Sequence, residues 1–103
     1  MILEQLKSMQ TEYLKAKDME KLGVLRYFIS QIQNKEIELR PQKQELTDEV
    51  IFKVLKKLIK QKNEAIDLST KAGREDSINK ETAELEILKG FVSLFPQELQ
   101  AHL

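Results

Sequence analysis

Apolar side chains recur every three or four residues along almost the whole chain, and this spacing constrains the fold more than any other feature. The clearest run consists of Leu22, Leu25, Ile29, Ile32, Glu36 and Leu39, in which Glu36 is the one polar member. Because an α-helix turns once in about 3.6 residues, these intervals place the run on one side of a helix. The pattern predicts an amphipathic helix here, and weaker versions of it predict three more.

Capping and turn residues divide the first half of the chain into two predicted helices. The first covers about residues 2–17. Asp18 is a suitable N-cap for the second, because its carboxylate can accept hydrogen bonds from the free N–H groups of the first turn. The second helix should end at Arg40, since Pro41 disfavours helical geometry in the residue before it. A polar linker is expected over residues 41–46.

The second half of the chain predicts two longer helices. Thr47 is a good N-cap for the third helix, which should run to Ala72. Gly73 then supplies the left-handed residue with which helices commonly end. A fourth helix is expected over about residues 75–94. Pro96 either ends it or opens a short final turn.

Each predicted helix is apolar on one side only, so its stability must come from packing against the others. We therefore predict an all-α fold: an elongated antiparallel four-helix arrangement of two helical hairpins, with a short C-terminal turn. The first helix should pair with the second and the third with the fourth, and the spacing favours crossing angles near 20°. The aromatic residues expected in the core are Tyr13, Tyr27, Phe28, Phe91 and Phe95.

The composition excludes several classes of function. There is no cysteine, which removes disulfides and cysteine zinc sites, and the one histidine, His102, is next to last. The three glycines stand alone, so no glycine-rich phosphate loop exists. No apolar run approaches the roughly 20 residues of a membrane span, and the N-terminus lacks a signal-peptide profile. We expect a cytoplasmic protein without a metal, a small-molecule cofactor or a membrane partner.

Charged residues gather around the joint between the third and fourth helices. Arg74 is placed to pair with Glu81 or Glu84, because a guanidinium group suits a carboxylate. One interpretation is a salt-bridge network that fixes the turn together with Gly73 and Asp76; the other is a polar site for an RNA phosphate or a partner's carboxylate. No nucleophile or metal-ligand set accompanies the two glutamates, so we assign no catalytic residue.

Five lysines follow one another between residues 51 and 63 with no acidic residue among them. They are Lys53, Lys56, Lys57, Lys60 and Lys62, of which the first four share one outward side at helical spacing. This side is either a solvated face opposite the core or a stripe that binds phosphates and releases their counterions. Phe52 lies off the main apolar side in this pattern, where it would stack on a base or meet another protein.

Glu36 interrupts the most regular apolar stripe of the chain. A charge that is even half-buried needs a partner, because its desolvation is costly. Arg26 and Lys62 are the candidates, and either would form an ion pair. We expect a structural role for this pair.

A more specific signal comes from individual residues between Lys60 and Leu99. These are the pair Ala65–Ile66, the run Ala72-Gly73-Arg74-Glu75-Asp76, Glu81 with Glu84, Leu85 with Leu88, and Pro96-x-x-Leu99; Leu22-Gly-Val-Leu-Arg26 and Asn34-x-Glu36-Ile37 precede them. Together they resemble the YqeY family, whose helical domain is also fused to the C-terminus of the GatB subunit of tRNA-dependent amidotransferase. Leu68 stands where that family often has an aromatic residue.

The resemblance implies an all-helical fold and a general label of carbon–nitrogen ligase activity with glutamine as the amide donor. In the amidotransferase the catalytic machinery sits in other domains and subunits, and the YqeY-like region helps to engage tRNA. The resemblance also implies a helical domain over residues 1–95, with residues 96–103 a short remnant of the family's C-terminal tail, which carries part of the tRNA contact.

Two functions follow as expectations. The first is a non-catalytic accessory module that binds tRNA or an amidotransferase-type protein partner through Lys53, Lys56, Lys57, Lys60, Lys62 and Arg74. The alternative is a module for protein interaction or self-association, which would use exposed apolar residues such as Phe52 and Leu68 and would have no RNA role. An independent amidotransferase-type enzyme is a third hypothesis, for which the sequence offers no nucleophile.

Overall fold

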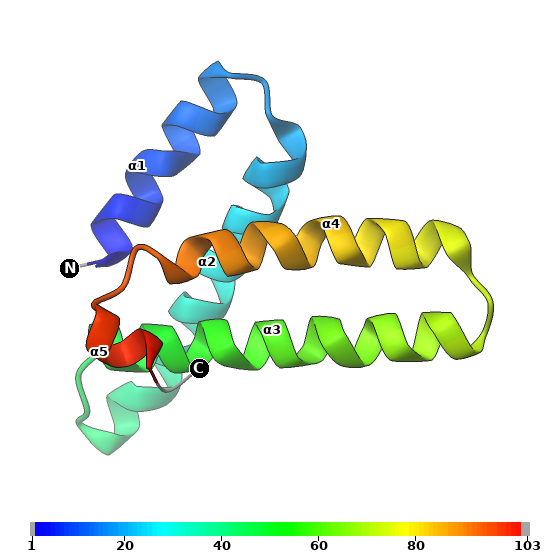
Figure 1. The fold of residues 1–103 in the computed structure, drawn as a ribbon. Helices are drawn as coiled ribbons and strands as arrows, with labels where there is room; N and C mark the ends of the chain where they lie inside the picture. The colour runs from blue at the N-terminus through cyan, green and yellow to red at the C-terminus, as the bar shows by residue number, and fades with distance from the viewer. Residues whose placement is uncertain (1, 102–103) are drawn as a thin grey trace.

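The computed structural model describes residues 2–101, and this range contains helices and turns without a β-strand (Figure 1). The helices are α1 (Ile2–Lys15), α2 (Met19–Leu39), α3 (Asp48–Lys71), α4 (Glu75–Val92) and α5 (Gln97–Gln100), with a 3₁₀ turn at Arg40–Gln42. The predicted all-α class is confirmed, and the four long helices end within two residues of the expected positions. Pro96 opens the short final helix α5. His102 lies outside the described residues.

Both predicted N-caps are confirmed. The backbone N–H of Lys21 donates to the Asp18 carboxylate, and that of Val50 donates to the Thr47 hydroxyl, each at 3.2 Å. A further bond, from the backbone N–H of Ile2 to Asp48 Oδ1 at 3.0 Å, joins the start of α1 to the start of α3. Such bonds satisfy donors that have no partner within their own helix.

Three connections between helices use a residue in the left-handed conformation. These residues are Lys17, Lys43 and Gly73, with φ of 57°, 55° and 68°. After α3, the N–H of Arg74 donates to the carbonyl of Ser69, and after α1 the N–H of Asp18 donates to that of Tyr13, each at 3.0 Å. This Schellman motif satisfies carbonyls that the last helical turn leaves free. The left-handed stop at Gly73 was predicted, whereas the two lysines were not.

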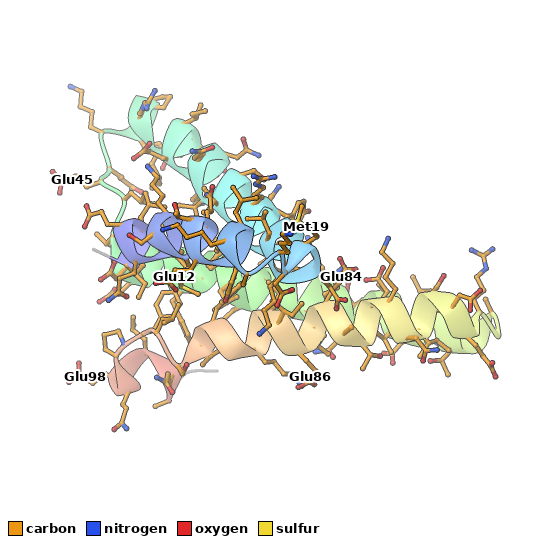
Figure 2. The ribbon with its side chains drawn as sticks, turned by 90° about the horizontal axis from the view of Figure 1, so that it is seen from above. Glu12, Met19, Glu45, Glu84, Glu86 and Glu98 are labelled. Atoms are coloured by element: carbon orange, nitrogen blue, oxygen red, sulfur yellow. The ribbon has the colours of Figure 1, made fainter. Side chains whose placement is uncertain are left out.

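The helices pair as predicted, α1 with α2 and α3 with α4, but the first hairpin crosses the second instead of lying along it (Figure 1). The reason is the distribution of apolar residues. All buried residues of α3 lie between Ile51 and Ile59, and those of α4 between Leu85 and Phe91. The first hairpin buries side chains only in that half. The remaining part of α3 and α4, residues 60–84, has no fully buried residue and is called the arm below; most of it extends beyond the first hairpin (Figure 2).

Two aromatic pairs lie in the core. The rings of Phe28 and Phe91 stack with centroids 5.7 Å apart, and those of Phe52 and Phe95 meet edge to face at 5.0 Å. Phe52 is only 2% exposed, so the prediction that it is free to meet a base or a protein is wrong. Phe95 follows α4 and packs against Phe52, which lies at the edge of the apolar side of α3.

The other aromatic residues divide between core and surface. Phe28, Phe91 and Phe95 are buried as expected, and Tyr13 is half-buried against the core. Tyr27 is 51% exposed, so its predicted place in the core is wrong. Within the described part of the chain, no helix combines the length and the hydrophobicity needed to cross a membrane.

Gly73→Ala should destabilise the fold, whereas the matched change Gly90→Ala should stabilise it. A methyl group meets open space at both positions, so the backbone decides the sign. Alanine in the left-handed region at Gly73 costs about 1–2 kcal/mol, while alanine within α4 is favoured over glycine by about 1 kcal/mol. Urea denaturation measures both free energies of unfolding. Shifts of the same sign in the two variants would contradict the structure of this turn.

Candidate functional site

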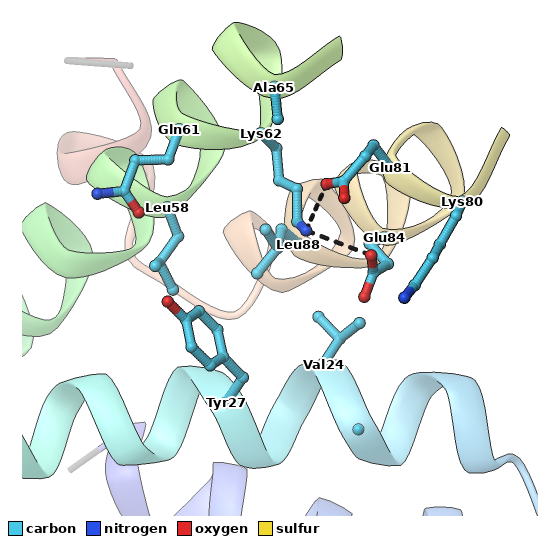
Figure 3. Close-up of a pocket in the computed structure, with 11 residues that line it drawn as sticks. Val24, Tyr27, Leu58, Gln61, Lys62, Ala65, Lys80, Glu81, Glu84 and Leu88 are labelled. Atoms are coloured by element: carbon cyan, nitrogen blue, oxygen red, sulfur yellow. Dashed lines mark hydrogen bonds and ion pairs between the residues drawn. The ribbon is translucent and has the colours of Figure 1, made fainter. Parts of the chain in front are cut away.

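A partly buried cluster of charged side chains lies between α3 and α4 (Figure 3). Lys62 Nζ donates to Glu81 Oε2 at 2.6 Å and to Glu84 Oε1 at 3.2 Å. All three side chains are about one quarter exposed, at 24%, 23% and 24%. We call this cluster the clasp, because it joins the two helices of the arm.

The positions of the clasp residues along each helix explain why they meet. Lys62 follows Leu58 by four residues and precedes Ile66 by four, so it lies on the apolar side of α3. Glu81 and Glu84 each precede a buried leucine of α4 by four residues. The apolar sides of α3 and α4 are therefore each interrupted by charged residues, and the interruptions face each other across the hairpin. The spacing of Lys62 from Leu58 and Ile66 is visible in the sequence, but the carboxylates that face it from α4 are not.

Arg74 is not the partner of the two glutamates, so that prediction is wrong. Arg74 precedes the first turn of α4, seven residues before Glu81, which is about 10 Å along a helix axis. It is exposed at the tip of the arm beside Gly73 and Asp76. Lys62 reaches the carboxylates from the facing helix instead.

The predicted partners of Glu36 are also wrong. Glu36 Oε1 lies 3.6 Å from Nη2 of Arg40, the residue that follows α2, and the side chains of Glu36 and Arg40 are 43% and 71% exposed. Lys62 is occupied in the clasp. Glu36 lies in the last turn of α2, where its side chain is partly exposed, so its charge does not need a partner from another helix.

The clasp raises the pKa of Lys62. Partial burial lowers this pKa, but the hydrogen bonds and the negative charges of Glu81 and Glu84 together outweigh burial and raise it above the ordinary 10.5. The side chain of Lys62 is therefore protonated at neutral pH. Because an ammonium group has no free lone pair, it cannot act as a nucleophile or a base there. The arrangement suits a structural role, and the described residues contain no group of three or more His, Cys, Asp or Glu side chains that could hold a metal ion.

A groove runs along α2 where it crosses the second hairpin. One part, with a volume of about 390 Å³, is lined by Tyr27, the clasp and Lys80 (Figure 3). The other part, of about 480 Å³, lies between α2 and the first half of α3. Tyr27, Leu58 and Gln61 line both parts, so the two are continuous. We call the whole the α2–α3 groove.

The groove continues past the clasp toward the start of α2. Met19 and Glu84 lie close together when the molecule is seen from above (Figure 2), and both line a further hollow of about 520 Å³. Gly23 and Val24 line this hollow as well as the part beside Tyr27. The exposed side of α2 therefore borders a concave surface over most of the helix.

The structure separates the five lysines of α3 into three kinds. Lys53, Lys57 and Lys60 are exposed, and the ion pairs found within residues 2–101 involve other side chains. Lys56 is half-buried, and Lys62 belongs to the clasp. Lys53 and Lys57 also line the α2–α3 groove. Three exposed cations therefore lie along one side of α3. Two of them, Lys53 and Lys57, line the groove that Tyr27 also lines.

Comparison with known proteins gives a consistent result. A model of the family described as YqeY-like protein matches residues 3–102. Three curated relatives all carry the name "Altered inheritance of mitochondria protein 41, mitochondrial". The relative from Eremothecium gossypii is 32% identical over 79% of this chain, and that from Kluyveromyces lactis is 35% identical over 79%.

The third relative, from Lachancea thermotolerans, is 31% identical over 85% of this chain. The matched regions make up 43%, 43% and 46% of the respective relatives. The match therefore covers less than half the length of these curated relatives.

Lys62→Met should lower the free energy of unfolding by about 1–3 kcal/mol, because it leaves two partly buried carboxylates without their counter-ion. Lys57→Met, an exposed change on the same helix, should cost less than about 0.5 kcal/mol. Urea denaturation at neutral pH measures both. Equal losses in the two variants would contradict a stabilising clasp.

The stabilisation by the clasp should also depend on pH. Since the pKa of Lys62 is raised by folding, this contribution is fully present below the ordinary value of 10.5 and is lost as the pH rises through the higher folded-state pKa. The difference in stability between the wild type and Lys62→Met should therefore shrink above that pH. A difference that stays constant there would argue against the ion pair.

Proposed function

Since this chain belongs to the YqeY-like protein family, we propose that it is a helical binding module that acts in tRNA-dependent amidotransfer and that RNA is its ligand. The proposed contact surface consists of Lys53, Lys57 and Lys60. The carbon–nitrogen ligase chemistry implied by the family resemblance would then belong to other domains or chains, while this module binds and orients the RNA.

The observation that carries this proposal is the row of exposed cations on α3. Lys53 and Lys60 are seven residues apart, about 10 Å along the helix, and no acidic residue lies between them. The opposite side of the same turns holds Leu55 and Leu58 in the core. The row is therefore fixed on a rigid support, and a polyanion that binds it releases its own counterions without ordering the backbone.

Other predicted contacts rank lower in this proposal. Lys56 is half-buried beside the row, and Lys62 is engaged in the clasp. Arg74 is exposed at the arm tip, beside the acidic Glu75 and Asp76. An RNA large enough to follow α3 toward Gly73 would reach it.

The alternative is a module for protein interaction or self-association. Leu68 favours it, because this side chain is 68% exposed on the arm. Phe52, which the sequence also predicted for this role, is buried. An amidotransferase-type protein partner would belong to this alternative.

The compartment is a separate matter. The cytoplasmic location expected from the sequence stays a prediction, and the printed names of the relatives describe those proteins as mitochondrial.

Binding of tRNA should fall with salt concentration and should depend on the three lysines. Replacing Lys53, Lys57 and Lys60 by Gln should weaken binding at low salt by roughly tenfold or more and should reduce the slope of log K against log salt by about 2–3. Filter binding or fluorescence anisotropy over a salt series measures both quantities.

The matched control replaces Lys7, Lys15 and Lys71, three exposed lysines elsewhere, and changes the net charge equally. It should bind nearly as the wild type does. Wild-type affinity no better than about millimolar at low salt, or equal losses in the two triple variants, would remove RNA from the proposal. Light scattering that shows a dimer dependent on Leu68 would favour the alternative.

A further inference from the structure

The α2–α3 groove contains an aromatic ring that is not packed in the hydrophobic core. Tyr27 is 51% exposed although it lies in the middle of α2, between the buried Val24 and Phe28. It lines both parts of the groove, and Figure 3 shows its ring directed toward Leu58 and Gln61 of α3. An exposed aromatic ring inside a concave site is a surface on which a planar group can stack.

Amide side chains make up much of the wall around this ring. Gln31, Asn34, Gln42, Gln44 and Gln61 line the groove. Each amide offers one carbonyl acceptor and two N–H donors, so it can bond to groups of either kind. A ligand that carries mixed donors and acceptors on a planar edge would match this wall.

The charge of the groove comes from α3. Lys35 and Glu38 line the α2 wall, where they pair with each other at 3.2 Å. Lys53 and Lys57 line the opposite wall, and neither takes part in an ion pair found within the described residues. The uncompensated charge of this part of the groove is therefore positive. It lies on the side that continues into the exposed lysine row.

We propose that the α2–α3 groove binds an unpaired segment of RNA, with a base stacked on Tyr27, its edge bonded by Gln61 and Gln31, and neighbouring phosphates held by Lys53 and Lys57. This inference rests on the proposed function, because it takes RNA as the ligand. Beyond that function, it specifies which part of the RNA is recognised, namely an unpaired segment. Single-strand sites commonly combine a cationic groove with aromatic rings on which bases stack.

The geometry favours an unpaired strand over a duplex and over an acidic peptide. In a duplex the faces of the bases are stacked on one another, so no face is free for Tyr27. An acidic peptide would satisfy Lys53 and Lys57 but would make little use of the ring. The two parts of the groove, about 390 and 480 Å³, each fall within the range of about 300–1,000 Å³ typical of small-ligand sites.

The test uses tryptophan as a reporter of stacking. The sequence contains no tryptophan, so Tyr27→Trp introduces a single one at the proposed stacking position. A single-stranded RNA of 12 nucleotides should quench the fluorescence of this tryptophan in a saturable manner. A duplex of the same length and a polyglutamate peptide should quench it much less.

Affinity gives a second measurement. Tyr27→Ala should weaken binding of the single strand by about 5- to 150-fold, the range found when a base-stacking aromatic is removed. Ile37→Ala is the matched control, because Ile37 is 58% exposed on the same helix and does not line the groove. It should bind as the wild type does. Urea denaturation of both variants checks that they are folded.

The outcomes separate this inference from the function on which it rests. If tRNA binds through the lysine row but Tyr27→Ala binds the single strand as tightly as Ile37→Ala, the groove assignment is overturned and the function stands. Equal quenching by polyglutamate would overturn it in favour of a peptide site, and equal quenching by the duplex would overturn the preference for an unpaired strand. If no RNA binds, both proposals fail together.

Discussion

The stacking of Phe28 on Phe91 is the contact on which the arrangement of the two hairpins depends. Phe28 comes from the middle of α2 and Phe91 from the last turn of α4, and both are almost fully buried. Burying two phenylalanine side chains contributes about 3–6 kcal/mol relative to leaving them in water. Because this contact lies at the crossing, it sets how α2 lies against α3 and α4. The walls of the α2–α3 groove are a consequence of that crossing.

Beyond the crossing, the arm is held together differently. No residue between 60 and 84 is fully buried, so hydrophobic burial contributes less there than in the core. The clasp provides a specific contact between the two helices at the point where the apolar stripes weaken. Regions with few buried apolar contacts open locally more readily than the core. The clasp therefore limits opening at the base of the arm, close to the groove, while Gly73 closes its far end.

The sequence predicted the helices well because helix formation depends on local features. Residue spacing identified the apolar sides, and Asp18, Thr47 and Gly73 marked ends through capping bonds and backbone conformation that depend on few neighbours. The left-handed conformations of Lys17 and Lys43 could not be predicted, because lysine has no preference for positive φ. At these two turns the hydrogen bonds from Asp18 to Tyr13 and from Gln44 to Leu39 hold the lysine in the left-handed conformation, although lysine itself disfavours it.

The candidate site was harder to predict, because spacing gives the angle of a residue around its helix but not what covers it. Phe52 lies at the edge of the apolar side of α3 and is buried in the core, where Phe95 reaches it from beyond α4. Tyr27 is two residues from both Leu25 and Ile29, which places it on the side of α2 opposite the apolar stripe, and there it is exposed. Lys62 differs from the other lysines through its partners on the facing helix.

The chain has 17 basic and 17 acidic side chains and therefore no net charge. Because electrostatic attraction at long range is weak for such a chain, recognition must depend on the local surface that the crossing creates.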